Sequence, residues 1–96
     1  MSRQLAFSEQ ANRDLDDIWS YLVEFDEGAA DSQITRIVEK CTYLIDMPFM
    51  GLKRNDLLPD LRRIIEGNYT IFYLVNDNEI QIVRVLRSNR DFKRHL

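Results

Sequence analysis

The chain has 96 residues, of which 45% are hydrophobic and 30% are charged, and its formal net charge is −3. This is enough for a single small domain spanning residues 1–96, and no apolar stretch reaches the roughly 20 residues that a membrane span needs. The acidic balance argues against broad, non-specific binding to nucleic acid. One cysteine, Cys41, excludes an internal disulfide, and with no signal-peptide pattern at the start we expect a cytoplasmic protein.

Charge is divided unevenly between the two halves of the chain. Residues 1–48 contain ten acidic and four basic residues, whereas residues 49–96 contain six acidic and nine basic residues. The second half therefore has the charge to contact a phosphate group or an acidic protein segment.

The first predicted elements are a short strand over residues 3–7 and a helix that follows it. Ser8 is a suitable N-cap, and apolar residues then recur at helical spacing from Ala11 to Val23. On this pattern Asp14, together with Asp17 and Glu24, falls on the opposite, solvent-facing side of the helix.

A second helix is predicted after a short break. Gly28 suits the end of the first helix, and Asp31 or Ser32 suits the start of the next. Its apolar stripe includes Cys41, which we expect in the core, and Pro48 ends it. Because the connection is short, the two helices should pack as an antiparallel hairpin.

The apolar period changes from 3.6 to 2 after a loop over residues 47–60. Three strands joined by tight turns are predicted, over residues 61–65, 69–75 and 79–86. The fold class is therefore α+β: an N-terminal strand, an antiparallel helical hairpin and a three-stranded antiparallel meander, with the first strand pairing with one strand of the meander. Both sheet faces carry apolar side chains, so the hairpin should cover one face and something else should partly cover the other.

Motifs for metal or cofactor chemistry are not found in the sequence. The single cysteine and the single histidine, His95, are far apart and give no zinc-binding spacing. A glycine-rich phosphate loop and a GxSxG nucleophile motif are also missing. We therefore expect no cofactor and no metal.

Basic residues are the distinctive feature of the second half. They are candidates for contact with a target or another partner, and they lie in the loop, on the strands and in the tail: Arg54, Arg62, Arg63, Arg84, Arg87, Arg90, Lys93 and Arg94.

Two interpretations of these residues stay open. They can be solvated charges or structural pairs, for example Arg84 or Arg90 with an acid such as Asp91 or Asp60. Alternatively, they form a basic concave surface that binds phosphate or carboxylate groups, because Arg62 or Arg63 and Arg84 are expected on neighbouring strands. On its strand, Arg84 shares the alternation of Ile80, Ile82 and Leu86.

Cleavage of RNA would require a general base and a general acid. Arginine, with a pKa above about 12, is a poor proton shuttle. His95 lies at the penultimate position, where chain termini tend to fray, and Tyr43, Tyr69 and Tyr73 are placed as core or half-buried residues. We therefore expect no catalytic residue.

Four segments together resemble the RelE/ParE toxin superfamily, specifically its ParE branch. They are FSEQANRDLDDIWSYL, MPFMGLKRNDLLPDLRRI, YTIFYLV and IQIVRVLRSNRDF, and they cover nearly the whole chain. The resemblance implies a plasmid or chromosomal type II toxin–antitoxin module in a bacterium. ParE-like toxins act on DNA gyrase and stabilise its cleaved-DNA state, which gives the expected function.

Two alternatives to gyrase inhibition remain. RelE-like relatives share the fold but cut mRNA on the ribosome; Arg87 stands where many family members have histidine, which weakens that reading. The third possibility is a non-toxic homologue that only binds an antitoxin. In each case the resemblance implies a cognate, ParD-like antitoxin and a hetero-oligomer with it, while direct contact with nucleic acid stays open.

Overall fold

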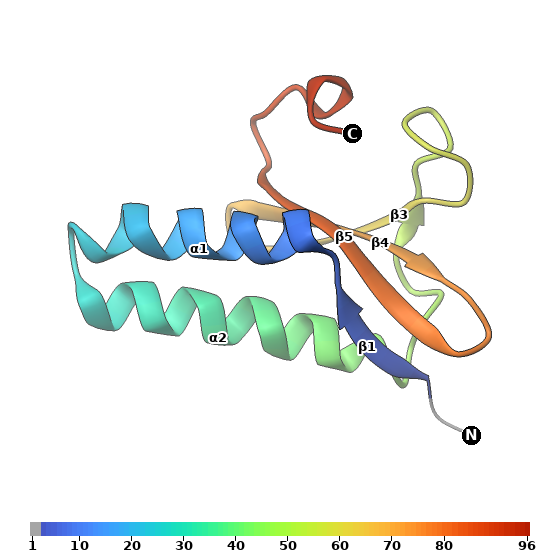
Figure 1. Ribbon diagram of the computed structural model, residues 1–96, viewed down its shortest axis with the longest axis horizontal. Helices are drawn as coiled ribbons and strands as arrows, with labels where there is room; N and C mark the ends of the chain where they lie inside the picture. Colours follow the sequence, from blue (N-terminus) through green and yellow to red (C-terminus); the bar gives the residue numbers. More distant parts are fainter. Residues whose placement is uncertain (1–2) are drawn as a thin grey trace.

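A hairpin of two helices lies against one face of a five-stranded sheet in the computed structural model, which describes residues 3–96 (Figure 1). The elements in chain order are β1 (Gln4–Phe7), α1 (Glu9–Val23), α2 (Glu27–Tyr43), β2 (Leu52–Lys53), β3 (Arg62–Glu66), β4 (Tyr69–Val75), β5 (Glu79–Arg87) and a short 3₁₀ helix, η1 (Phe92–Arg94).

The strand order in the sheet is β1-β5-β4-β3-β2. β1 runs parallel to β5, and the remaining neighbours are antiparallel. The α+β fold, the meander and the pairing of the first strand with a meander strand are therefore confirmed. β2 was not predicted, because two residues within a loop give no periodic signal. Within residues 3–96, neither helix combines the length and the apolar character needed to cross a membrane.

The ends of the two helices are set by capping side chains. Ser8 caps α1 as predicted and accepts a hydrogen bond from the Ala11 amide at 2.9 Å. The predicted start of α2 at Asp31 or Ser32 was wrong. Asp26 caps this helix by accepting from the Ala29 amide at 3.1 Å, so Gly28 lies in the first turn of α2 rather than at the end of α1.

The core has two layers, one on each face of the sheet. On the helix side, Cys41 is fully buried as predicted, and burial raises the pKa of its thiol to about 12. On the other face, the C-terminal segment supplies the cover. Phe92 packs edge-to-face on Phe72 with ring centroids 4.8 Å apart, and Leu96 packs against the same cluster.

The buried Tyr73 hydroxyl holds the long loop against the sheet. It donates to the Pro48 carbonyl at 2.9 Å and accepts from the Gly51 amide at 2.9 Å. Both hydrogen-bonding functions of the phenol are thus used inside the fold.

Replacing Gly51 with alanine should destabilise the protein. An added Cβ would lie 2.5 Å from the Tyr73 hydroxyl and 2.7 Å from the Arg63 carbonyl, so the strand or the loop must shift. We expect the free energy of unfolding in urea to fall by about 1–3 kcal/mol.

Gly28→Ala is the matched control. Its Cβ would meet only the Asp26 side chain, at 3.2 Å, in the first turn of a helix. We expect a change within about 1 kcal/mol. Equal stability of Gly51→Ala and the wild type would show that the loop is not held tightly at Gly51.

Candidate functional site

A β-bulge in β5 changes which face its side chains occupy. Phe72 pairs with Arg84, whereas the next residue, Tyr73, pairs with Ile82, so Val83 is an extra residue in β5. Ile82 therefore faces the helices. Val83 packs on the other face with the tail-side core, to which Phe72, Leu86 and Phe92 belong.

The predicted alternation on this strand was wrong because of the bulge. Ile80 and Ile82 lie in the helix-side core, whereas Leu86 lies in the tail-side core. The bulge also places Arg84 opposite Phe72, and from there its side chain reaches an acidic residue of α1.

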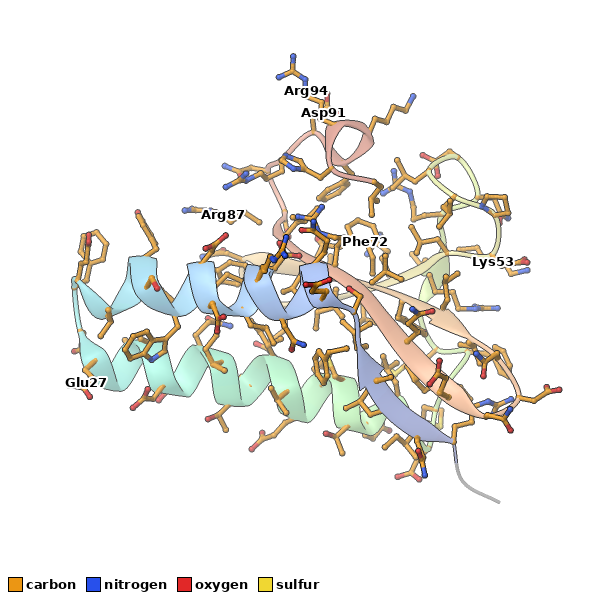
Figure 2. All side chains as sticks on the ribbon, in the orientation of Figure 1. Glu27, Lys53, Phe72, Arg87, Asp91 and Arg94 are labelled. Carbon is orange, nitrogen blue, oxygen red and sulfur yellow. The ribbon has the colours of Figure 1, made fainter. Side chains whose placement is uncertain are left out.

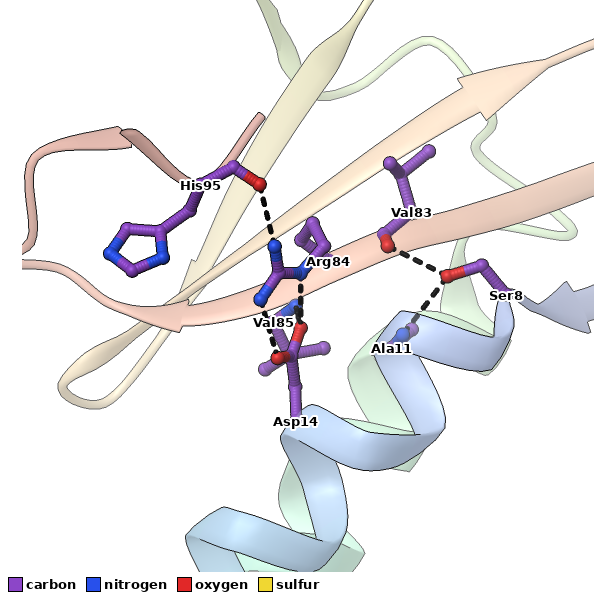
Figure 3. Close-up of polar contacts among 7 residues, drawn as sticks. All are labelled: Ser8, Ala11, Asp14, Val83, Arg84, Val85 and His95. Carbon is purple, nitrogen blue, oxygen red and sulfur yellow. Dashed lines mark hydrogen bonds and ion pairs between the residues drawn. The ribbon is translucent and has the colours of Figure 1, made fainter. Parts of the chain in front are cut away.

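Asp14 of α1 is that acid, and Figure 3 shows its contacts. Its carboxylate accepts from Nε and Nη2 of Arg84, each at 2.8 Å, and from the Val85 amide at 2.9 Å. β1 pairs with β5 only as far as Ile82. The Val85 amide therefore has no residue of β1 beside it, and the Asp14 carboxylate accepts its hydrogen bond instead.

The start of α1 follows the same edge of β5. The Ser8 amide donates to the Ile82 carbonyl at 2.9 Å. The Ser8 hydroxyl donates to the Val83 carbonyl at 2.7 Å while accepting from the Ala11 amide (Figure 3). The first turns of α1 therefore satisfy the polar groups of β5 beyond the end of β1.

Arg84 also holds the C-terminal segment. Its Nη1 donates to the backbone carbonyl of His95, whose imidazole is directed away from the guanidinium group (Figure 3). The hydrogen bonds to Asp14 raise the pKa of Arg84 further, so its charge is permanent but compensated.

These contacts correct two predictions. Asp14 was expected on the solvent-facing side of its helix, but it is buried. Arg84 does form a structural pair with a carboxylate, as one of the two open interpretations had it, but the acid is Asp14 rather than Asp91 or Asp60. The arginine reaches across 70 residues of sequence, so no local spacing indicated the pair.

A pocket of about 420 Å³ opens beside this ion pair. Its walls are α1, the end of β5 and the C-terminal segment. Asp14 and Asp17 line one side. The other polar and aromatic side chains around it are Tyr21, Tyr69, Arg84, Arg87, Arg90 and His95.

Arg87 and Arg90 differ from Arg84 because neither forms an ion pair with a carboxylate in the described part of the chain. Arg87 lies over the ring of Tyr21, 5.9 Å from its centroid, and extends from the end of β5 toward α1 (Figure 2). Both guanidinium groups are thus available at the pocket. No cluster of histidine, cysteine and acidic side chains that could hold a metal ion occurs within residues 3–96.

Two other candidate arginines are already engaged in the loop. Arg54 forms a two-fold ion pair with Asp56, with both distances 2.9 Å. Arg62 donates to the carbonyls of Phe49 and Gly51. Both groups therefore support the loop structure.

The remaining candidates lie outside the pocket. Arg63 lies on β3, where it pairs with Phe72 of β4. Lys93 and Arg94 belong to η1, and Figure 2 places Arg94 at the top of the molecule. The expectation that Arg62 or Arg63 neighbours the strand of Arg84 was wrong, because β4 lies between β3 and β5. Of the eight candidates, only Arg84, Arg87 and Arg90 line the pocket.

Sequence reasoning missed Asp14 and Tyr21 as parts of the site. Asp14 lies three residues after Ala11 and four before Ile18, and these three are the buried positions of α1. Its place inside the apolar stripe was therefore a usable signal for a buried partner. Nothing in the helical spacing marked Tyr21, whose side chain is exposed.

Comparison with known proteins gives a consistent result. Residues 5–92 match the family model described as ParE toxin of type II toxin–antitoxin system, parDE. Toxin ParE1 of Caulobacter vibrioides is 32% identical over 93 residues, covering 93% of each chain. Toxin ParE1 of Mycobacterium tuberculosis is 29% identical and covers the whole of both chains.

Solved structures agree in fold. The chromosomal ParDE toxin–antitoxin system from P. aeruginosa superposes with a TM-score of 0.74 at 27% identity, covering 88% of this chain and 95% of that one. The toxin–antitoxin complex RelBE2 from Mycobacterium tuberculosis gives a TM-score of 0.64 at 20% identity, covering 91% and 99%. The second likeness concerns the fold alone.

Asp14→Asn should destabilise the protein strongly. The substitution leaves the partly buried Arg84 charge uncompensated and turns one of the two accepting carboxylate oxygens into an amide donor, so the Arg84 and Val85 donors cannot all be satisfied. We expect the free energy of unfolding in urea to fall by about 3 kcal/mol.

Asp17→Asn is the control, because Asp17 lines the same pocket but is exposed and forms no ion pair within residues 3–96. Its effect should stay within about 0.5 kcal/mol. Similar losses for the two variants would contradict a special role of Asp14.

Proposed function

The chain belongs to the ParE family of type II toxin–antitoxin toxins, and from this premise we propose that it inhibits DNA gyrase by stabilising the complex of that enzyme with cleaved DNA. In this proposal the toxin binds and performs no chemistry of its own. The observation that carries it is the pair of unpaired guanidinium groups, Arg87 and Arg90, at the rim of the pocket. They can bind a target while Arg84 keeps the fold together.

The state of the tyrosines and arginines supports binding rather than catalysis. The Tyr73 hydroxyl is enclosed between Pro48 and Gly51, and burial raises the pKa of Tyr73 above its usual value. Arg84 is committed to Asp14. A general base needs a free group with a pKa near the working pH, which neither arginine nor this phenol supplies.

An antitoxin is the second proposed partner, as in the solved ParDE and RelBE2 systems. A cluster of large apolar side chains remains exposed between the end of α2 and β2. Exposed fractions range from 43% to 62% for Tyr43, Met47, Phe49, Met50 and Leu52. Such a patch fits a segment that folds onto the toxin and forms a stable hetero-oligomer.

An mRNA endonuclease remains the second candidate function. One observation favours it: His95, which could move a proton, lines the same pocket as three arginines and Tyr69. This candidate requires the imidazole to reach a bound substrate, whereas the gyrase proposal does not.

A gyrase cleavage assay tests the proposal. Purified toxin, supercoiled plasmid and ATP should give linear DNA after treatment with detergent and protease, and a cognate antitoxin should suppress it. Arg90→Gln should lower the yield of linear DNA about tenfold, equivalent to roughly 1.4 kcal/mol of binding. Point substitutions are preferable to deletion of the tail, which would uncover Phe72 and Leu86.

Arg13→Gln is the matched control. Arg13 is exposed on α1 and pairs with Glu9 at 3.2 Å, outside the pocket. It should leave the yield unchanged. Growth arrest in cells without any linear DNA in the assay would contradict gyrase as the target.

Tyr73→Phe separates structural from catalytic use of the phenol. Losing the hydroxyl leaves the Gly51 amide and the Pro48 carbonyl without their partner, so stability should fall by about 1–2 kcal/mol. Growth arrest should persist once expression is adjusted to equal amounts of folded toxin. Mapped mRNA cuts that vanish in Tyr73→Phe or His95→Gln would instead favour the endonuclease.

A further inference from the structure

The pocket combines positive charge with one exposed aromatic ring, Tyr21, and a second exposed ring, Phe25, lies beside it outside the pocket. Tyr21 is 50% exposed and Phe25 is 72% exposed, and their rings meet edge-to-face with centroids 5.3 Å apart. Arg87 covers part of the Tyr21 ring, and Arg90 lines the same pocket. Two neighbouring rings at the end of a helix leave apolar surface in contact with water, which is unfavourable, and a ligand stacked on them would remove that surface from water.

We propose that this pocket binds one phosphate of a single DNA strand and that the adjacent base stacks on Tyr21. Guanidinium groups present a planar fork of donors that matches phosphate oxygens, and within residues 3–96 neither Arg87 nor Arg90 uses them in an ion pair. An unpaired base offers a π face for which an aromatic side chain is a general partner.

The geometry favours a single strand over a duplex. The wall formed by α1 carries Asp14 and Asp17, and the chain as a whole has a net charge of −3. Asp14 is neutralised by Arg84, so Asp17 is the uncompensated acid of this wall. Together with the acidic balance of the chain, it disfavours the dense charge of a long duplex more than one phosphate at Arg87 and Arg90.

An acidic protein segment is the competing ligand. It could use the two guanidinium groups, but a carboxylate side chain has no aromatic face to place on Tyr21 or Phe25. A nucleotide uses both features within one residue, with its phosphate at the guanidinium groups and its base on the ring, and this favours nucleic acid.

The inference rests on the proposed function and deepens it. Gyrase holding cleaved DNA is a setting in which strand ends can become unpaired, so a contact of this kind would let the toxin hold the DNA as well as the enzyme.

The test is fluorescence anisotropy with the full-length toxin and a labelled eight-nucleotide oligo(dT) at low salt. Tyr21→Ala should weaken binding about tenfold, while Tyr21→Phe, which keeps the ring, should bind like the wild type. Arg87→Gln should also weaken binding, and the slope of log K against log salt should be about −0.7 for the wild type, as expected for one phosphate on a single strand.

Arg36→Gln controls for loss of positive charge elsewhere. Arg36 lies 3.9 Å from Glu66 and does not line this pocket. Its affinity for the oligonucleotide should match that of the wild type. No binding by the wild type, or equal weakening in Tyr21→Ala and Arg36→Gln, would overturn the inference.

The gyrase assay separates this inference from the proposed function. If Tyr21→Ala loses oligonucleotide binding and yields about tenfold less linear DNA, the inference holds. If Tyr21→Ala binds the oligonucleotide as tightly as the wild type and linear DNA is undiminished, the DNA contact is overturned and the gyrase proposal stands. If Tyr21→Ala weakens binding to gyrase without DNA by the same factor, the pocket contacts protein and the inference is overturned. If the wild-type toxin binds the oligonucleotide but yields no linear DNA, the gyrase proposal fails and the strand contact stands alone.

Discussion

The carboxylate of Asp14 joins three parts of the molecule. It accepts two hydrogen bonds from Arg84 and one from the Val85 amide, and Arg84 in turn holds the His95 carbonyl. Helix α1, strand β5 and the C-terminal segment therefore depend on one partly buried ion pair. Breaking such a pair costs far more than its formation contributes, because the remaining charge is left without compensation.

This arrangement divides five of the eight candidate basic residues into two groups. Arg54, Arg62 and Arg84 are bound to groups of the protein itself. Arg87 is the last residue of β5 and pairs with Tyr69, and Arg90 follows where the chain leaves the sheet. Both line the pocket. The C-terminal segment is not a free arm, since Phe92 and Leu96 pack on the sheet, and this gives the exposed basic groups a defined place.

The regular parts of the fold could be predicted from the sequence. Helical spacing from Ala11 and the alternation of residues 69–75 identified α1 and β4, because apolar periodicity reports burial directly. The β-bulge escaped prediction because one extra residue, Val83, exchanges the two faces without changing composition. The tail has no periodicity, so the packing of Phe92 could not be inferred.

The site was predicted less completely than the fold. Arg84, Arg87 and Arg90 were among the candidates, but their separation from Arg62 and Arg63 depends on strand order, which periodicity does not encode. The importance of Asp14 depends on an edge of β5 left open by the shortness of β1. Both features are tertiary: the spacing of Asp14 between Ala11 and Ile18 signals its burial, but nothing local identifies its partner.

A double-mutant cycle on Asp14 and Arg84 tests the central claim most directly. The free energy of unfolding would be measured for the wild type, Asp14→Asn, Arg84→Gln and the double variant. The account predicts a coupling free energy of about 2–3 kcal/mol, because each single substitution leaves the remaining residue without its charge partner. A coupling near zero would mean that the two residues contribute independently and that this ion pair does not hold the pocket together.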